Sequence, residues 1–453
     1  MVYYLRKRDR ESQKNFFRRS FEMKKALCAA LAVLMALTLL PGCNKEGGST
    51  TADGKTKLLL GLPGGDGTTA WKIVENFIAA NSDKYEITTD ESAWGDFTKK
   101  LQLQVASKQD VTPVFFTDSM QAMTFGANGQ VLDLKDWVDS EIDASLYSDA
   151  LFAITDDEGH LWGVPHALNS IAVVYNKDIF DERGVAYPTE DWTFQDMLDM
   201  AEKLTFTRED GTKVYGIQYA TNITQGWLPF MSAVGVIPYK DNYQYSNLDD
   251  PKVKEAMEKY RIAIDKGCMM EPAEMSAIGG QDQAFAQDLI AMAIVQSSAL
   301  SKINSWDPDM NYDAQIMPIG WNGERTCVYV PNTWQIYSGV DENVEAACKD
   351  WLKYYLSEEG QMLVATEGGS GFPIMKSALD AISTSGRKPE HIDVFYKGID
   401  EYGQTLLENP SSSVSRTIVD AMCSDIRFGE DIDARIAEAH EEMKNTLDDF
   451  YER

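Results

Sequence analysis

Histidine and cysteine, the residues that most often bind transition metals or act as nucleophiles, are scarce in this chain of 453 residues. The sequence contains four histidines and six cysteines, and it has neither an H-E-x-x-H nor a C-x-x-C pattern. These absences argue against a zinc hydrolase, a structural zinc module and a dithiol redox protein. We therefore expect no metal site and no cofactor.

Basic residues are also few, with 42 Lys and Arg against 71 Asp and Glu and a formal net charge of −29. Residues 1–42 hold nine Lys/Arg and three Asp/Glu, so the charge of the remainder is −35. A protein that binds nucleic acid or anionic lipid presents a basic face to phosphate. The charge balance argues against nucleic acid and anionic lipid as partners.

Phosphate-binding and hydrolase motifs are missing as well. Neither G-x-G-x-x-G nor G-x-x-x-x-G-K-[ST] occurs, and residues 368–372 miss the G-x-S-x-G elbow because Phe372 stands in place of the last glycine. A glycoside-acting enzyme that uses a pair of carboxylates stays open, since the chain is rich in Asp and Glu. A turnover measurement separates that enzyme from a binder.

The amino-terminal segment is typical of an export signal. A basic run precedes the apolar residues 26–40, which are too few for a transmembrane helix and end at Pro41-Gly42, so residues 1–42 are predicted to be a signal peptide. Leu40 to Cys43 resembles the bacterial lipobox, in which the cysteine is lipidated and becomes the first mature residue. Met23 offers a second start, which would leave residues 1–22 untranslated.

The rest of the chain divides into a tether and a folded part. Residues 43–56 are rich in Gly, Ser, Thr and charge, as expected of a flexible tether. About 400 residues follow, which suits two domains better than one. Four cysteines in this part, Cys268, Cys327, Cys348 and Cys423, are widely spaced and are either disulfide-bonded or buried as free thiols.

Hydrophobic periodicity predicts alternating strands and helices, which build a mostly parallel sheet covered by helices. Two separate strands, 161–165 and 171–175, are expected around a polar break at His166 and Asn169, where the chain changes domain. Helices are expected to begin at Thr193, with Asp196 completing a capping box, and at Asp250-Pro251. The expected strands are residues 57–62, 85–89, 111–116, 214–219, 290–295, 315–318 and 326–330, the first helices span about 70–78 and 96–107, and the last hundred residues are mainly helical.

Several blocks of sequence, in order, resemble the family 1 extracellular solute-binding proteins, which include sugar- and maltodextrin-binding proteins. The blocks begin with Trp94-Gly95-Asp96-Phe97 and continue through Gly163-Val164-Pro165 and Val174 to Phe180. Further matches lie at residues 113–134, 192–204, 284–303, 341–361 and 369–376. The resemblance covers nearly the whole mature chain.

This resemblance implies a two-lobed α/β clamshell with two or three chain crossings as its hinge. One lobe would comprise residues 57–165 and 335–380, and the other residues 166–334 and 381–453. The protein would be a monomeric lipoprotein on the outer face of the membrane, anchored only by its lipid. It would capture a small-molecule solute, a mono- or short oligosaccharide, and deliver it to the permease of an ABC importer. A non-sugar solute and a signalling role remain alternatives.

Candidate ligand-binding residues follow from sugar chemistry, which calls for aromatic platforms and planar polar side chains, and from the resemblance. Gly65 and Asp66 follow the first strand and form either a binding loop or a plain turn. Trp94 precedes a helix, with Asp96 in its first turn, and either stacks on ligand or closes the core. Asp118 and Ser119 match a ligand-contacting loop of the family and also suit a helix N-cap.

The remaining candidates lie at the expected crossings or on loops that reach the cleft in relatives. The resemblance assigns them to Asn169, Trp227, Asn332, Thr333 and Trp334, whereas His166 reads as structural. Two departures argue against a long oligosaccharide: Ser297-Ser298 and Ser411 to Ser413 stand where relatives carry aromatic residues. Arg416, which follows Ser411 to Ser413 in the sequence, is expected either to bind an acidic sugar or to pair with surface carboxylates.

Overall fold

The computed structural model describes residues 49–367, 371–382, 384, 386–404 and 410–453. The predicted signal peptide, the lipidation site Cys43 and part of the near-miss elbow at residues 368–370 lie outside these residues. Within the described part, no helix combines the length and the apolar character that crossing a membrane requires.

The first part of the fold is the predicted alternation of strands and helices. β1 (Thr56–Gly61) pairs in parallel with β2 (Tyr85–Asp90) on one side and with β3 (Val114–Thr117) on the other. Helix α2 (Trp71–Asn81) buries one apolar face, and α3 (Trp94–Ser107) does the same. Strands that are buried on both faces read as continuous apolar runs, which is why β1 and β3 were visible in the sequence.

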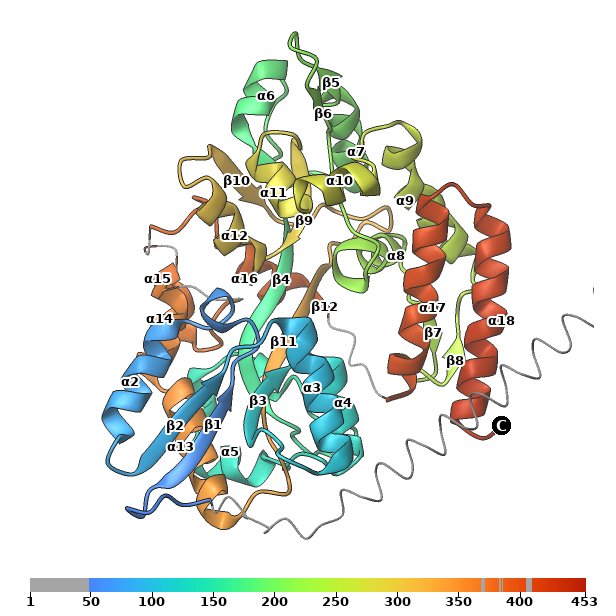
Figure 1. The fold of residues 1–453 in the computed structure, drawn as a ribbon. Helices are drawn as coiled ribbons and strands as arrows, with labels where there is room; N and C mark the ends of the chain where they lie inside the picture. Colours follow the sequence, from blue (N-terminus) through green and yellow to red (C-terminus); the bar gives the residue numbers. More distant parts are fainter. Residues whose placement is uncertain (1–48, 368–370, 383, 385, 405–409) are drawn as a thin grey trace, which may run out of the picture. The chain divides into compact units, whose positions relative to one another are not determined.

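Two long strands extend the sheet beyond this parallel part. β11 (Cys327–Ile336) runs antiparallel to β3 and to β4 (Val164–Asn176). The first half of β4 pairs with β11, and its second half pairs with β9 (Met292–Gln296) and β10 (Tyr312–Gln315), both antiparallel. In Figure 1, β4 and β11 run side by side through the middle of the fold. The sheet as a whole is therefore mixed.

The expected break at His166 and Asn169 is wrong, because β4 is one continuous strand with every residue buried. Its polar side chains find partners far away in the sequence. His166 Nε2 lies 3.2 Å from Thr69 Oγ1, and Ser170 Oγ donates to the carbonyl of Phe395 at 3.0 Å. Buried polar groups are tolerated when they are hydrogen-bonded, so the polar residues do not interrupt the strand.

Helices make up most of the second half. α7 (Phe194–Lys203) begins with the predicted capping box between Thr193 and Asp196, and α9 (Pro251–Asp265) begins at the predicted cap Asp250. The strand expected at 214–219 is reduced to β6 (Lys213–Val214) and isolated bridges. The other helices and turns are η1 (Gly65–Gly67), α4 (Ser119–Ala127), α5 (Lys135–Glu141), η2 (Ala144–Leu146), η3 (Asp149–Phe152), α6 (Lys177–Arg183), η4 (Ile223–Trp227), α8 (Leu228–Val234), α10 (Pro272–Ile278), α11 (Gln281–Ala286), α12 (Ala299–Trp306), α13 (Glu342–Leu356), α14 (Glu358–Glu367), α15 (Lys376–Ile382), α16 (Val394–Tyr402), α17 (Pro410–Arg427) and α18 (Ile432–Phe450), and the short strands are β5 (Phe206–Thr207), β7 (Tyr239–Lys240), β8 (Tyr245–Ser246) and β12 (Gly403–Gln404).

Two large hydrophobic clusters stabilise the fold. One gathers around β1, β3, α2 and α13, and the other around α7, α8, α9, α17 and α18. Alternate residues of β4 contribute to each, with Val174 in the first cluster and Val173 in the second. Phe285 and Tyr312, which were expected in the second lobe, belong to the first cluster. The residue boundaries of the two lobes stay a prediction.

The four cysteines of the described part are free and buried. Burial raises the pKa of the Cys327 thiol to about 12 and raises that of Cys423 well above its usual value. A thiolate is the reactive form of cysteine, so these thiols are held in their unreactive form.

Candidate functional site

A cavity of about 330 Å³ lies where the loops after β1 and β3 meet β4, β11 and the helices of the second half. One wall comes from the parallel part of the sheet. Gly67 and Thr68 follow β1, and the left-handed backbone of Gly64 and Gly65 makes the tight turn that brings them there. Loops at the carboxyl ends of parallel strands are the usual place for a ligand in such sheets.

Trp94 is the aromatic residue of this wall. It is the first residue of α3, it is half-buried, and its ring lies 5.8 Å from that of Phe116 at a tilted angle. Because Phe116 is fully buried, it supports Trp94 from behind while the exposed part of the indole lines the cavity. A rigid aromatic surface held in this way is suited to stacking on an apolar face of a ligand.

Asp118 stands next to Trp94 along the same wall. It is the N-cap of α4, where its carboxylate accepts a hydrogen bond from the Gln121 amide at 2.9 Å, and Ser119 follows it into the cavity. Burial raises the pKa of Asp118, and the Arg416 guanidinium and the helix amides oppose that rise only in part. The side chain is thus an acceptor when ionised and a donor when protonated.

The floor of the cavity is formed by the two long strands. Asn169 of β4 and Asn332 of β11 line it, and both are nearly buried. The amide oxygen of Asn169 accepts hydrogen bonds from Ser297 Oγ at 3.0 Å and from the Ser298 amide at 3.1 Å, and its nitrogen donates to Ser298 Oγ at 3.3 Å. Asn169 therefore fixes the position at which α12 begins.

The opposite wall comes from η4, α12 and α17. Asn222 caps η4 by accepting from the Gln225 amide at 2.9 Å, and Thr224 follows it. Lys302 of α12 and Arg416 of α17 bring positive charge to this wall. The cavity thus combines one aromatic surface, several amide and hydroxyl groups and charges of both signs, which is the composition of a small polar ligand site.

The fold and this cavity place the chain among known proteins. The family model of bacterial extracellular solute-binding proteins matches residues 72–391. The chain belongs to that family. Binding proteins of Brucella abortus (strain 2308) and Brucella suis biovar 1 are each 24% identical over 218 residues, which is 46% of this chain and 52% of theirs. The chain spans about half the length of the curated relatives it matches.

Solved structures of solute-binding proteins match over most of their length. An ABC substrate-binding protein of Listeria monocytogenes in complex with cycloalternan has a TM-score of 0.76 at 17% identity, covering 87% of this chain and 99% of that one. A solute-binding protein of Thermotoga lettingae bound to α-D-tagatose has a TM-score of 0.73 at 18% identity, covering 86% and 99%. The GacH receptor of Streptomyces glaucescens, studied with acarbose, has a TM-score of 0.73 at 16% identity, covering 87% and 98%. The two-lobed α/β fold is thereby shown.

Half of the residues selected from the sequence of this solute-binding protein line the cavity. The structure brings together Trp94, Asp118, Ser119, Asn169, Asn332 and Arg416. Gly65 is a buried residue of the turn beside Gly67, and Asp66 lies in the same turn. Asp96 is exposed in the first turn of α3 and does not line the cavity.

Trp227, Thr333 and Trp334 are not at the cavity surface of this solute-binding protein. Trp334 is fully buried among aromatic rings, and Thr333 Oγ1 donates to the carbonyl of Pro331 at 3.1 Å. Trp227 is also fully buried, and its Nε1 donates to Asp420 Oδ1 at 2.7 Å. The sequence placed Trp227 on a loop near the cleft and placed Thr333 and Trp334 at an expected crossing between the lobes. In the structure all three side chains are buried inside the protein instead.

Other cavity residues of the solute-binding protein were missed. Ser298 was noted in the sequence only because a serine stands where relatives carry an aromatic residue. Its hydrogen bonds to Asn169 nevertheless place it in the cavity wall. Asn222 carries a usable signal, since an Asn three residues before a Gln is typical of a helix start. Lys302 and Tyr329 carry no signal in the sequence that would mark them as cavity residues. Each lies inside a helix or strand whose orientation depends on contacts with distant parts of the chain.

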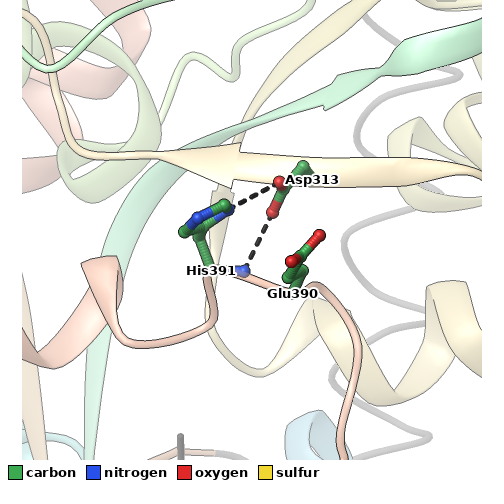
Figure 2. A group of neighbouring side chains, drawn as sticks. All are labelled: Asp313, Glu390 and His391. Carbon is green, nitrogen blue, oxygen red and sulfur yellow. Dashed lines mark hydrogen bonds and ion pairs between the residues drawn. The ribbon is translucent and has the colours of Figure 1, made fainter.

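A second cluster of polar groups lies away from the cavity. Figure 2 shows His391 Nδ1 bonded to Asp313 Oδ2 at 2.7 Å and the His391 amide bonded to Asp313 Oδ1 at 3.0 Å, with Glu390 beside them. The Ala314 amide also donates to Asp313 Oδ1, at 2.9 Å. Protein groups therefore already occupy both oxygens of the buried Asp313, and the cluster ties β10 to the segment before α16.

Proposed function

We propose that this chain is the substrate-binding protein of an ABC importer and that its solute is a mono- or short oligosaccharide. The observation that supports this most directly is Trp94 in one cavity with the planar polar side chains Asp118, Asn169 and Asn332. A sugar ring offers apolar C–H faces to an aromatic ring and hydroxyl edges to such groups. The sugars named with the Listeria, Thermotoga and Streptomyces structures support the same cargo.

In this proposal the solute holds two lobes together. Residues 57–165 and 335–380 would form one lobe and residues 166–334 and 381–453 the other, with β4 and β11 crossing between them. Trp94 and Asp118 then line the cavity from one lobe and Lys302 and Arg416 from the other, with Arg416 Nη1 already 3.9 Å from Met120 Sδ on α4. A solute that contacts both sides stabilises the closed form by its additional affinity for that form.

Thermal unfolding of the chain from Cys43 onward, with Cys43 replaced by Ser, tests the cargo against sugars, peptides and polyamines. A solute at a hundred times its dissociation constant adds about 2.7 kcal/mol to the free energy of unfolding, so the midpoint is expected to rise with a carbohydrate. A rise only with peptides or polyamines would contradict the sugar assignment and keep the receptor.

Trp94→Ala is expected to weaken sugar binding at least tenfold, equivalent to about 1.4 kcal/mol, because the stacking surface is lost. Isothermal titration measures this directly. Trp137→Ala is the matched control, since Trp137 is also half-buried against the first hydrophobic cluster but does not line the cavity. Equal losses of affinity in the two variants would argue that Trp94 acts through stability alone.

We further propose binding without turnover. The family and the matched structures are binding proteins, which supports this reading. Chromatography of the sugar after prolonged incubation is expected to return it unchanged, and a shortened product would favour the glycoside-acting enzyme. A role in signalling rather than import uses the same cavity, and measurement of uptake in a strain lacking the protein separates the two.

The localisation that we propose is the outer face of the bacterial cytoplasmic membrane, with Cys43 as the lipid anchor and a monomer docking on the permease. Cys43→Ser is expected to move the protein from the membrane fraction to the soluble fraction, because a single protein chain without its acyl groups has no other anchor in this proposal. Cys28→Ser, a change within the predicted signal peptide, is the matched control and is expected to leave the protein with the membrane. Retention of the Cys43→Ser protein in the membrane fraction would refute lipid anchoring.

A further inference from the structure

We infer that Ser298 recognises the solute by donating a hydrogen bond to one of its oxygens, and that Asn169 holds the Ser298 hydroxyl in the orientation that this bond requires. This role rests on the proposed function and makes Ser298 a specificity-determining residue of that site. Ser298 lies between β9 and α12, is half-buried and lines the cavity.

The hydrogen bonds of Asn169 determine which end of its side-chain amide is the oxygen. The backbone amide of Ser298, which can only donate, lies 3.1 Å from Asn169 Oδ1, and Ser297 Oγ donates to the same oxygen at 3.0 Å. The other end of the amide is therefore Nδ2, which lies 3.3 Å from Ser298 Oγ. An amide NH2 group has donors only, so Ser298 Oγ is the acceptor of this bond.

The direction of that bond leaves the proton of the Ser298 hydroxyl for another partner. A hydroxyl has one proton and two lone pairs, and Asn169 occupies one of the lone pairs. The Ser298 side chain makes no capping bond to the amides of α12, and among the described residues its hydroxyl donates to no acceptor. A donor that is shut off from water without an acceptor is costly, so a solute with an oxygen at this point is favoured over one without it.

Ser298 is also held rigidly, as a residue that discriminates between solutes has to be. The Ser297 amide donates to the Ser170 carbonyl of β4 at 2.9 Å, which anchors the chain just before Ser298. Ala299 and Leu300, which begin α12, are buried. The hydroxyl is thus presented from the end of a paired strand and the start of a packed helix.

The two asparagines of the cavity floor differ in what they have left for the solute. Both lone pairs of Asn169 Oδ1 and one of its two N–H groups are already used by Ser297 and Ser298. Asn332 is nearly buried, and among the described residues its side chain has no hydrogen-bond partner, so its whole amide is available to the solute. Asn169 therefore acts mainly as a positioning residue for Ser298.

Sugar analogues test the direction of the bond from Ser298. Isothermal titration of the chain from Cys43 onward, with Cys43→Ser, first identifies the tightest binder among glucose, galactose, mannose, xylose, maltose and cellobiose. Its deoxy and deoxyfluoro analogues are then titrated position by position, because a C–F group can accept but not donate a hydrogen bond and a deoxy position can do neither. At one position we expect the deoxy analogue to bind roughly 3- to 10-fold more weakly than the sugar, and the fluoro analogue to recover part of that loss.

Ser298→Ala identifies which position of the sugar meets Ser298. The variant is expected to bind the unmodified sugar roughly 3- to 10-fold more weakly and to bind that one deoxy analogue as tightly as the parent protein does, because the partner of the hydroxyl is already absent. Ser301→Ala is the matched control, since Ser301 is exposed on the same helix and does not line the cavity. It is expected to leave every affinity unchanged.

Asn169→Asp tests the positioning role with almost no change of shape. An ionised carboxylate has no N–H group, so the Ser298 hydroxyl would donate to it instead of to the solute. The variant is therefore expected to weaken binding of the unmodified sugar more than binding of the deoxy analogue identified with Ser298→Ala. Equal weakening of both would show that Asn169 does not act through Ser298.

The results that would overturn the inference are distinguishable from failure of the proposed function. A fluoro analogue that binds as weakly as the deoxy analogue at the identified position would show that the sugar donates to Ser298, which reverses the direction of the bond. Equal losses in Ser298→Ala for the sugar and for every deoxy analogue would show that Ser298 does not contact the solute, and the carbohydrate receptor would stand. Failure of all six sugars to bind would refute the proposed function, and the role of Ser298 with it.

Discussion

Trp334→Ala is expected to lower the free energy of unfolding by about 3–5 kcal/mol, the range typical of truncating a large buried aromatic side chain. Trp334 is fully buried, and its ring lies 5.0 Å from Phe116, 5.4 Å from Trp351 and 5.4 Å from Tyr355. Removing the indole leaves a cavity among rings that are themselves fixed by the sheet and by α13. Denaturant unfolding at neutral pH, with the solute absent, measures the loss.

Trp94→Ala is the informative comparison for Trp334→Ala. Trp94 is half-buried, so its truncation removes less contact from the core and more from the cavity. We therefore expect different effects from the two substitutions. Trp334→Ala mainly lowers the free energy of unfolding, and Trp94→Ala mainly lowers the affinity for the solute. A Trp334→Ala protein that is as stable as its parent but no longer binds solute would place Trp334 at the ligand, as the sequence had suggested.

Acidification below pH 6.5 is expected to destabilise the protein through His166, in addition to the effect of carboxylate protonation. Burial lowers the pKa of His166 to about 3, and its ring is stacked 3.9 Å from Phe116. The unfolded chain takes up the proton near pH 6.5 whereas the folded chain resists it until about pH 3, so stability falls as pH falls through this window. The contribution is about 1.4 kcal/mol per pH unit, or about 2 kcal/mol at pH 5.

His166→Gln tests this by comparing unfolding at pH 7 with unfolding at pH 5. The variant is expected to be less stable than the parent at pH 7 and to lose less stability on acidification. His391→Gln is the matched histidine control with the opposite sign, because Asp313 raises the pKa of His391 and that pair contributes stability at acid pH. If His166→Gln loses as much stability as the parent between pH 7 and pH 5, then His166 is not buried in its neutral form.

The elements that the sequence predicted well are those specified by neighbouring residues. β1 and β3 appear as apolar runs, and α7 begins at Thr193 because the cap and its partner Asp196 are three residues apart. The continuity of β4 was not predictable, since the partners of His166 and Asn169 are Thr69 and Ser298. The residues next to His166 and Asn169 in the sequence give no indication of hydrogen-bond partners that lie about a hundred positions away.

The candidate site shows the same limit. Asp118 and Ser119 were found because they follow an apolar strand and begin a helix, a pattern that places them at the end of the sheet. The presence of a tryptophan in a loop does not predict whether its side chain points into the cavity or into the core. Trp94 reaches the cavity and Trp227 enters the core, and the difference comes from Asp420, which lies 193 residues away and accepts the Trp227 indole.

The floor of the cavity has a mechanical consequence, because Asn169 and Asn332 lie on the two strands that would cross between the proposed lobes. If β4 and β11 are the pivot, a contact to either asparagine has a short lever arm and changes little when the lobes rotate. Trp94, Lys302 and Arg416 lie on the walls, where the same rotation produces a larger displacement. Contacts at the floor would thus contribute similar affinity for the solute in the open and the closed form. Contacts at the walls would contribute more affinity in the closed form, and this difference would favour closure.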